Sequence, residues 1–333
     1  MMKKKIFSIL LLTGILVSVF MGSNGISQTI VLKGVTSFPR PHVNNDPVAP
    51  FIDEVNKRSQ GRLKLEWLGG PEIFGSFDQI HAIKGGSIDM LFYLAFGLMK
   101  SVMPEAEAKG LSQQAAWEER KSGAFDLWTE IFEKRANAKY LGSFHSNITF
   151  NIYSNKKFEK IADFKGANIR TMPLYIPLIR ALGANPITLP PVEIYTAMER
   201  GVVNGFMWPR WGITGLGLQE VTKFVIEPGV FRMEPATLVN LDRWKKIPKD
   251  LQDIMMETMK DYEQIATQRA FMLMDQENKI LEKAGVKIIK LSPEDSEKFI
   301  KLAYDSTWEQ VIKSAPEYGP KLRELSSKAA LKK

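Results

Sequence analysis

Residues 161–209 constrain the fold more than any other stretch, because short apolar runs alternate there with helical segments and glycine-closed turns. The pattern predicts a strand, a helix, a strand, a helix and a strand, in that order: 167–171, 174–182, 186–189, 192–201 and 205–208. Strands that alternate with helices in this way are typical of an open parallel sheet, whose ligands bind beyond the ends of the strands.

Arg170 lies at the end of the first strand in this stretch. Its guanidinium is always charged, and its planar fork of N–H donors matches a carboxylate. At a strand end that faces a cleft, Arg170 is expected to be a carboxylate receptor. The alternative is an ordinary surface ion pair with Asp or Glu, and residue chemistry alone leaves the two interpretations balanced.

The first half of the chain predicts a βαβαβ unit. Its elements are expected at residues 30–37, 48–58, 63–67, 78–84 and 88–92. The loops that follow its strands are rich in aromatic residues, namely Phe38, His42, Phe77, Phe92, Tyr93 and Phe96. Each of them alone is expected to be a packing residue, whereas as a group they are expected to line one wall of a cleft.

Residues 248–285 keep a helical period without a break, from a proline to a terminal glycine. At 1.5 Å per residue such a helix is about 50 Å long, enough to cross two domains. Its methionine-rich stripe lacks a regular heptad, which favours packing in the core over a dimeric coiled coil. The lysine-rich tail from Lys321 is expected to be a solvated end.

The N-terminus has the organisation of a secretory signal peptide, with Lys3–Lys5 preceding an apolar run of residues 6–21. We assign residues 1–27 to this signal. The alternative is an uncleaved membrane anchor, but the run is short for a span of about 20 residues. The expected location of the mature protein is therefore the periplasm or an equivalent compartment.

Composition excludes several functions. The chain has no cysteine, which rules out disulfides, thiol nucleophiles and zinc–thiolate sites. It has three widely spaced histidines, and none of the common hydrolase, metalloprotease or nucleotide-binding motifs occurs, so we expect no enzyme activity. Without Lys3–Lys5 the count is 45 − 3 = 42 basic against 37 acidic residues, or +5, which gives little support to nucleic-acid binding.

Several segments resemble the solute receptors of tripartite ATP-independent periplasmic (TRAP) transporters, the DctP-type family. The resemblance covers about residues 31–262. It is carried by ADFKGANIR (162–170), LGANP (182–186) and PVEIYTAMERGVVNG (191–205), and earlier by FIDEVNKRSQGRLKLEWLGGPEIFG (51–75) and GGSIDM (85–90).

The resemblance implies an α/β, two-domain periplasmic-binding-protein fold with an interdomain cleft and a long domain-spanning helix. We expect residues 28–147 with 236–270 to form the first lobe, and 148–235 with 271–333 the second. In this family the arginine that matches Arg170 binds the ligand carboxylate. The implied partners are a small organic acid and the membrane permease subunits, with the receptor itself a monomer.

The chain departs from the family pattern around the expected ligand. Phe150 stands where many members have a second basic ligand-contacting residue, and Met172, Trp208 and Trp211 add further apolar surface. Arg210 offers a second charge only if it points inward. A ligand with many hydroxyl groups would lose hydrogen bonds here, so the expected ligand is an aromatic or otherwise apolar carboxylate.

The expected ligand-binding residues are Arg170, Trp208, Phe150, Met172, Phe92, Tyr93, Phe38, Phe77, Trp211 and Arg210. We expect no cofactor and, since Glu193 has no Asp beside it, no bridging metal ion. Two alternative functions stay open: a receptor that presents its ligand to a membrane sensor kinase, and a secreted enzyme that uses the same cleft.

Overall fold

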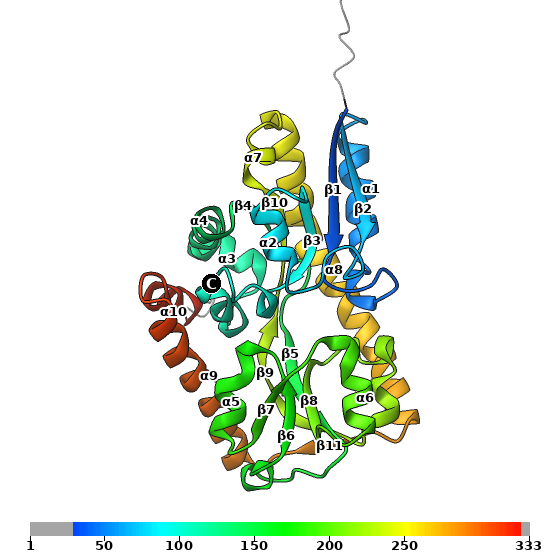
Figure 1. Ribbon diagram of the computed structural model, residues 1–333, viewed down its shortest axis with the longest axis vertical. Helices are drawn as coiled ribbons and strands as arrows, with labels where there is room; N and C mark the ends of the chain where they lie inside the picture. The colour runs from blue at the N-terminus through cyan, green and yellow to red at the C-terminus, as the bar shows by residue number, and fades with distance from the viewer. Residues whose placement is uncertain (1–28, 328–333) are drawn as a thin grey trace, which may run out of the picture.

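The structure, a computed structural model, describes residues 29–327 as two α/β lobes, each built around one sheet (Figure 1). The sheet of the first lobe has the order β2-β1-β3-β10-β4, from β1 (Ile30–Thr36), β2 (Leu63–Gly69), β3 (Met90–Ala95), β4 (Ala138–Gly142) and β10 (Pro235–Asn240). The sheet of the second lobe has the order β11-β9-β5-β8-β6-β7, from β5 (Ile148–Ser154), β6 (Asn168–Thr171), β7 (Asn185–Thr188), β8 (Gly205–Pro209), β9 (Phe224–Met233) and β11 (Lys287–Lys290). The predicted two-lobed α/β fold is confirmed.

Helices cover both sheets. The α-helices are α1 (Val48–Arg58), α2 (Gln79–Lys84), α3 (Ala116–Ser122), α4 (Ala124–Ala136), α5 (Ile176–Ala181), α6 (Ile194–Glu199), α7 (Leu241–Trp244), α8 (Lys249–Lys283), α9 (Pro293–Ser314) and α10 (Gly319–Ser327). The 3-10 helices are η1 (Val43–Asn45), η2 (Phe96–Leu98), η3 (Pro104–Leu111), η4 (Ile161–Phe164), η5 (Pro173–Tyr175), η6 (Pro191–Glu193), η7 (Thr214–Leu216) and η8 (Leu218–Val221).

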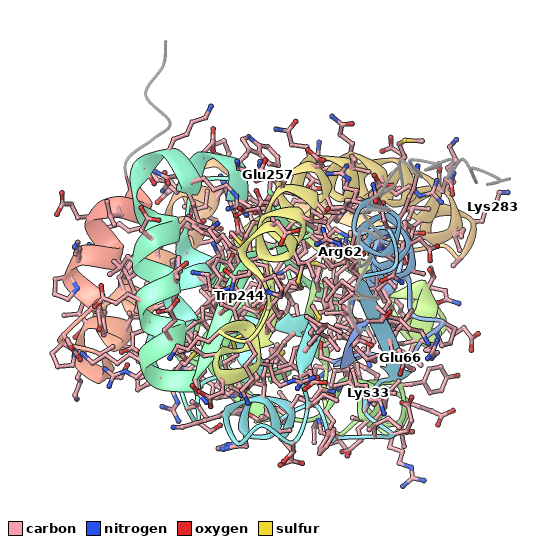
Figure 2. All side chains as sticks on the ribbon, turned by 90° about the horizontal axis from the view of Figure 1, so that it is seen from above. Lys33, Arg62, Glu66, Trp244, Glu257 and Lys283 are labelled. Atoms are coloured by element: carbon pink, nitrogen blue, oxygen red, sulfur yellow. The ribbon has the colours of Figure 1, made fainter. Side chains whose placement is uncertain are left out.

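The first lobe forms the βαβαβ unit that the sequence predicts. Strand β1 pairs in parallel with β2 and β3, and β10 pairs antiparallel with β3 and β4. On the solvent side of β1 and β2, Lys33 and Glu66 are register partners (Figure 2). Helix α1 is amphipathic and buries Val48, Phe51 and Val55, because residues three and four apart share one helix face.

The sheet of the second lobe is mixed, whereas the sequence predicted a parallel one. Strands β6, β7 and β8 pair in parallel, as expected from residues 161–209. Strand β5 pairs antiparallel with β8 and β9. The reason is that β5 enters this sheet from β4 of the other lobe, and so lies outside the strand–helix–strand series of residues 161–209 from which the parallel arrangement was predicted.

Helix α8 spans both lobes, as predicted (Figure 1). In the first lobe its Glu263 carboxylate accepts hydrogen bonds from Arg120 Nε at 2.9 Å and Nη2 at 2.7 Å. In the second lobe its Glu277 carboxylate accepts from the backbone N–H of Gly212 at 2.5 Å and of Thr214 at 2.8 Å. The core packing expected for the methionine stripe holds only in its first part: Met255 and Met259 are fully buried, whereas Met272, further along the helix, is 58% exposed.

The C-terminal tail corrects one expectation. Instead of a solvated end, the described part of the tail forms α10, which buries Leu322 and Leu325 and contacts α4 and η3 of the first lobe. Just before it, Tyr318 Oη donates a hydrogen bond to Glu130 of α4 at 2.9 Å. Tyr318, Leu322 and Leu325 have the spacing of one helix face, and this pattern in the sequence would have predicted a packed helix.

The lobe boundaries given above stay predictions. The proposed signal peptide, residues 1–27, lies outside the described residues. No helix within residues 29–327 is long and apolar enough to cross a membrane.

Candidate functional site

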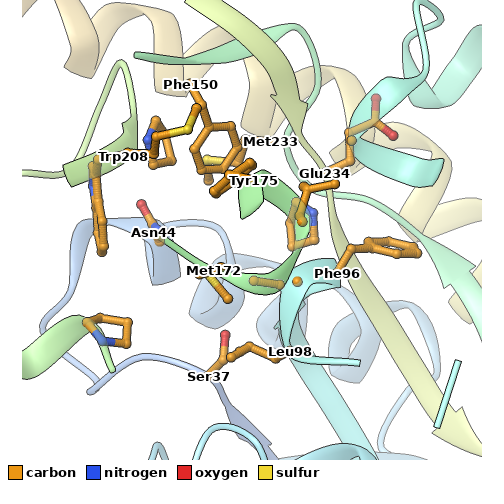
Figure 3. A pocket seen from close by; sticks show the side chains of 18 of the residues that line it. Ser37, Asn44, Phe96, Leu98, Phe150, Met172, Tyr175, Trp208, Met233 and Glu234 are labelled. Atoms are coloured by element: carbon orange, nitrogen blue, oxygen red, sulfur yellow. The ribbon is translucent and has the colours of Figure 1, made fainter. Parts of the chain in front are cut away.

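A pocket lies between the two lobes, at the ends of strands from both sheets (Figure 3). Its cavity volume is about 60 Å³, several times the roughly 10–15 Å³ that one water molecule needs. The first lobe and its crossover contribute Ser37, Phe38, Asn44, Tyr93, Ala95, Phe96, Gly97, Leu98, Gly110, Glu234 and Pro235. The second lobe contributes Phe150, Arg170, Met172, Leu174, Tyr175, Pro191, Met207, Trp208, Pro209, Arg232 and Met233.

Arg170 is a buried charge in this pocket, with only 1% of its surface exposed. Its Nε and Nη2 donate hydrogen bonds to the carbonyl oxygen of Leu189, at 3.0 and 2.7 Å. Its Nη1 has no hydrogen-bond partner, and the guanidinium has no carboxylate partner, anywhere in residues 29–327. Burial lowers the pKa of Arg170 to about 10, so that it stays charged near neutral pH.

Besides Arg170, and besides Glu234, whose carboxylate is ion-paired with Lys109, three residues that line the pocket carry a buried polar atom without a hydrogen-bond partner in the described chain: Ser37 Oγ, Asn44 Oδ1 and Trp208 Nε1. Unpaired buried polar groups are rare in folded proteins, because each costs about 1–3 kcal/mol. Together with Arg170 Nη1, these atoms give the pocket donors for an anion and one acceptor for an N–H or O–H group.

The loop that carries Ser37, Phe38 and Asn44 is held by its own hydrogen bonds. Asn45 Nδ2 donates to the carbonyl oxygens of Phe38 at 3.2 Å and of Pro39 at 2.7 Å. The Thr36 hydroxyl donates to the Phe38 carbonyl oxygen at 2.9 Å. The polar and aromatic side chains of this loop are therefore presented from a fixed backbone.

Aromatic rings close the pocket from both lobes. The ring of Phe38, from the first lobe, lies edge-on to Trp208 of the second lobe, with centroids 6.2 Å apart. His42 stacks on Phe38 with centroids 4.4 Å apart and also lies edge-on to Trp208 at 6.4 Å. These rings form an aromatic contact between the two lobes.

The structure places six of the ten predicted site residues in this pocket: Arg170, Trp208, Phe150, Met172, Tyr93 and Phe38. Phe77 lines an adjoining cavity at the cleft entrance. Figure 3 shows Phe150, Trp208 and Ser37 on different sides of the pocket between the lobes, which we call the inner pocket. A role of these residues in ligand binding stays a prediction.

Phe92, Trp211 and Arg210 do not line the pocket. Phe92 is fully buried and packs over Gly34 of β1, because neighbouring residues of a strand point to opposite faces and Tyr93 takes the pocket side. Trp211 is buried edge-on against the ring of His145, at 5.0 Å. Arg210 forms an ion pair with Glu227 at 3.3 Å and borders a separate hollow beside α8.

Sequence reasoning missed several lining residues, chiefly Ser37, Asn44, Tyr175, Met233 and Glu234. Tyr175 follows Met172 by one helical turn, and this spacing was a usable signal. Asn44 had none, because it is one of several polar residues in an irregular loop.

A buried charge cluster adjoins the pocket at the crossover from β9 to β10. Lys109 of η3 forms ion pairs with Glu119 of α3 and with Glu234, the latter at 2.9 Å. Figure 3 shows the Glu234 carboxylate turned away from Met172 and Asn44. Burial raises the pKa of Glu234 to about 8; the charge of Lys109 opposes this rise and the charge of Glu119 adds to it.

This cluster predicts a pH dependence of stability. The folded protein keeps a proton on Glu234 that the unfolded chain releases above its ordinary pKa of 4.5. The stabilising contribution is therefore full below pH 4.5 and is lost as the pH rises through about 8. Relative to Glu234→Gln, the free energy of unfolding should fall by up to about 1.4 kcal/mol per pH unit over this window. Urea unfolding of the parent protein and of Glu234→Gln between pH 5 and 9 measures this fall. If the two free energies of unfolding differed by the same amount at every pH, the raised pKa of Glu234 would be contradicted.

Two lobes with a pocket between them, which holds a buried cation without a counter-ion in the described chain, are typical of the two-lobed receptors that capture a small solute. The chain belongs to the DctP family, the bacterial extracellular solute-binding proteins of family 7, whose sequence profile matches residues 36–314. The resemblance to TRAP solute receptors is thereby confirmed.

Similar proteins agree with this assignment. A solute-binding protein of Albidiferax ferrireducens is 25% identical over 89% of this chain and 90% of its own length. The monocarboxylate 2-oxoacid-binding periplasmic protein all3028 of Nostoc is 28% identical to this chain. The match covers 66% of this chain and 62% of the Nostoc protein. A TRAP periplasmic solute-binding protein of Desulfovibrio salexigens, solved with bound orotic acid, has the same fold, with a TM-score of 0.81 and 22% identity over 89% of this chain and 97% of that one.

Proposed function

We propose that this protein is the periplasmic receptor of a TRAP transporter, and that it captures a small organic carboxylate with an aromatic or otherwise apolar body. Lobe closure traps the ligand, and the closed form delivers it to the membrane permease. The observation that carries the proposal is Arg170, a buried cation whose Nη1 lacks any partner within residues 29–327. A buried charge without a counter-ion is costly, and a ligand carboxylate supplies one.

The geometry of Arg170 favours one approach for this carboxylate. The Leu189 carbonyl oxygen occupies the side of the guanidinium formed by Nε and Nη2. Of the five N–H groups, the two on Nη1 and one on Nη2 stay available. They form the end of the guanidinium, to which a carboxylate binds with two parallel hydrogen bonds.

The rest of the pocket supports an apolar ligand body. Its walls are mainly aromatic, methionine and proline side chains, from Phe150, Met172, Tyr175, Trp208 and Met233 among others. Ser37 and Asn44 add a few polar atoms, enough for about one further polar group. Orotic acid, found in the Desulfovibrio protein, is a flat heterocyclic carboxylate, and the Nostoc relative is named for 2-oxoacids. A sugar acid would leave most hydroxyls unpaired, at about 1–3 kcal/mol each.

A thermal-shift screen of carboxylates tests the ligand class. The panel compares benzoate, phenylpyruvate and orotate with pyruvate and gluconate, on mature protein freed of ligand by unfolding and refolding. An acid at 100 times its dissociation constant should stabilise the protein by about 2.7 kcal/mol. Stabilisation by gluconate alone would overturn the apolar pocket, and no response to any acid would overturn the receptor assignment.

Two further measurements separate this proposal from the alternatives. Mass spectrometry of the recovered ligand should show it unchanged, whereas conversion would indicate an enzyme. Uptake of the labelled acid should fail in cells that lack the receptor. Normal uptake with loss of a transcriptional response would instead indicate a partner of a sensor kinase.

A further inference from the structure

A second cavity adjoins the inner pocket at the entrance of the cleft. It has a volume of about 270 Å³ and shares three lining residues with the inner pocket: Ser37, Phe38 and Pro191. Its other lining residues again come from both lobes: Pro39, Pro71, Gly75, Ser76, Phe77 and Asp78 from the first, and Pro190, Val192 and Leu216 from the second. The two cavities therefore form adjoining parts of one cleft.

The outer cavity is lined by apolar side chains that the fold leaves open to solvent. Phe77 is 37% exposed and Val192 is 63% exposed, and they line the cavity from opposite lobes. Exposed apolar residues that gather around a concave surface commonly mark a binding site. Nothing in the packing of either lobe requires an exposed Phe or Val at these positions.

The walls of this cavity are rigid, as expected for a built site. Ser76 Oγ donates a hydrogen bond to the Ser37 carbonyl oxygen at 3.0 Å and so ties the loop after β2 to the loop after β1. Gln79 Nε2 donates to the carbonyl oxygens of Thr36 at 2.8 Å and of Phe74 at 3.0 Å. Prolines 190 and 191 fix the backbone on the opposite lobe.

We propose that the outer cavity is a second subsite, which binds the apolar tail of a monocarboxylate whose carboxylate lies at Arg170. This inference rests on the proposed function and narrows the ligand to an elongated, amphipathic acid. The tail passes between Phe38 and Pro191, which line both cavities. The inner pocket, at about 60 Å³, is smaller than the outer cavity, at about 270 Å³, so a long tail extends into the outer cavity.

The charge of the outer cavity determines which tails fit. Asp78 is the one charged side chain among the described residues that line it. A negative charge there repels a second carboxylate at the far end of the ligand. The subsite therefore selects acids with an uncharged tail over α,ω-dicarboxylates of the same length.

Isothermal titration with a series of acids of increasing length tests the proposal. The series runs from butanoate to decanoate, and in parallel from benzoate to 5-phenylpentanoate. Affinity should rise roughly fourfold for each methylene that becomes buried, and the gain should continue beyond the length that fills the inner pocket. Octanedioate should bind at least tenfold more weakly than octanoate, and Asp78→Asn should narrow this difference.

Two variants connect the length dependence to the outer cavity. Val192→Asp introduces a charge at an exposed position, and Phe77→Ala removes an apolar wall; both should reduce the affinity ratio of the longest to the shortest acid at least tenfold. Phe271→Ala is the matched control, because Phe271 of α8 is also 37% exposed but lines neither cavity. This control should leave the ratio within twofold of the parent value.

The outcomes separate the two proposals. If short acids bind and depend on Arg170 but length brings no gain, the outer subsite is wrong and the receptor function stands. If Val192→Asp impairs uptake by cells while the length dependence stays intact, the surface docks the permease instead, and the subsite is again wrong. If no carboxylate binds, both the function and the subsite are wrong.

Discussion

Arg170→Ala is expected to remove most of the ligand affinity, by about 2–5 kcal/mol, because it deletes the buried partner of the ligand carboxylate. The loss should appear for every carboxylate that binds, since all share the same charged end. The folded protein itself should keep its stability, because the variant also removes a buried cation that has no counter-ion in the described chain. Isothermal titration with the tightest acid of the screen, together with urea unfolding of the ligand-free variant, separates a loss of binding from a loss of fold.

Arg170→Lys should be nearly as damaging. The guanidinium bonds the Leu189 carbonyl oxygen with one side and offers its end to the ligand, whereas an ammonium is a point charge that does not make both sets of bonds in fixed directions. Arg210→Ala is the control, since Arg210 lies outside the pocket in an ion pair with Glu227. If Arg170→Lys bound the ligand as tightly as the parent protein, Arg170 would not bind the carboxylate through two paired hydrogen bonds. A large loss of affinity in Arg210→Ala would show that Arg210 contacts the ligand after all.

Local patterns in the sequence were sufficient for much of the fold. The segments around Arg170 form strands and helices close to where periodicity and glycines put them, and α1 has the predicted bounds, residues 48–58. Strand direction was not predictable in the same way. Whether β5 runs parallel or antiparallel to β8 depends on how the chain passes from one lobe to the other, and no local pattern encodes that passage.

In the site, too, the residues placed by local patterns were predictable and those placed by the tertiary fold were not. Arg170 and Met172 were predictable because a strand end positions them. Phe92 and Tyr93 are adjacent aromatic residues of β3, and the sequence does not tell which of the two side chains points into the pocket, because that depends on which face of the sheet is turned toward it. Trp211 and Arg210 follow the end of β8, where the chain turns away from the pocket toward His145 and Glu227. Asn44 and Ser37 depend on a loop conformation fixed by distant hydrogen bonds, which one sequence alone does not reveal.

Lys109→Met is expected to destabilise the protein by about 3–5 kcal/mol, the usual cost of leaving a buried charge without its partner. The change leaves Glu119 and Glu234 together in the interior without their shared cation. It also removes the ammonium from a cage of rings, since Lys109 Nζ lies 5.7 Å from the centroid of Tyr140 and 5.9 Å from those of Phe96 and Trp128. Equilibrium unfolding in urea at pH 7 measures the loss.

Adding Glu119→Gln to Lys109→Met replaces the second carboxyl of this buried cluster with a neutral amide, so the double variant should recover a large part of the stability. Lys134→Met is the control, because the Lys134–Glu317 pair is about half exposed on both sides, and such pairs contribute at most about 1 kcal/mol. Equal stabilities for the single and double variants would show that Lys109 acts through packing alone. Recovery would show instead that the crossover between the lobes, directly beside the pocket, is held by a charge balance that the proton on Glu234 completes.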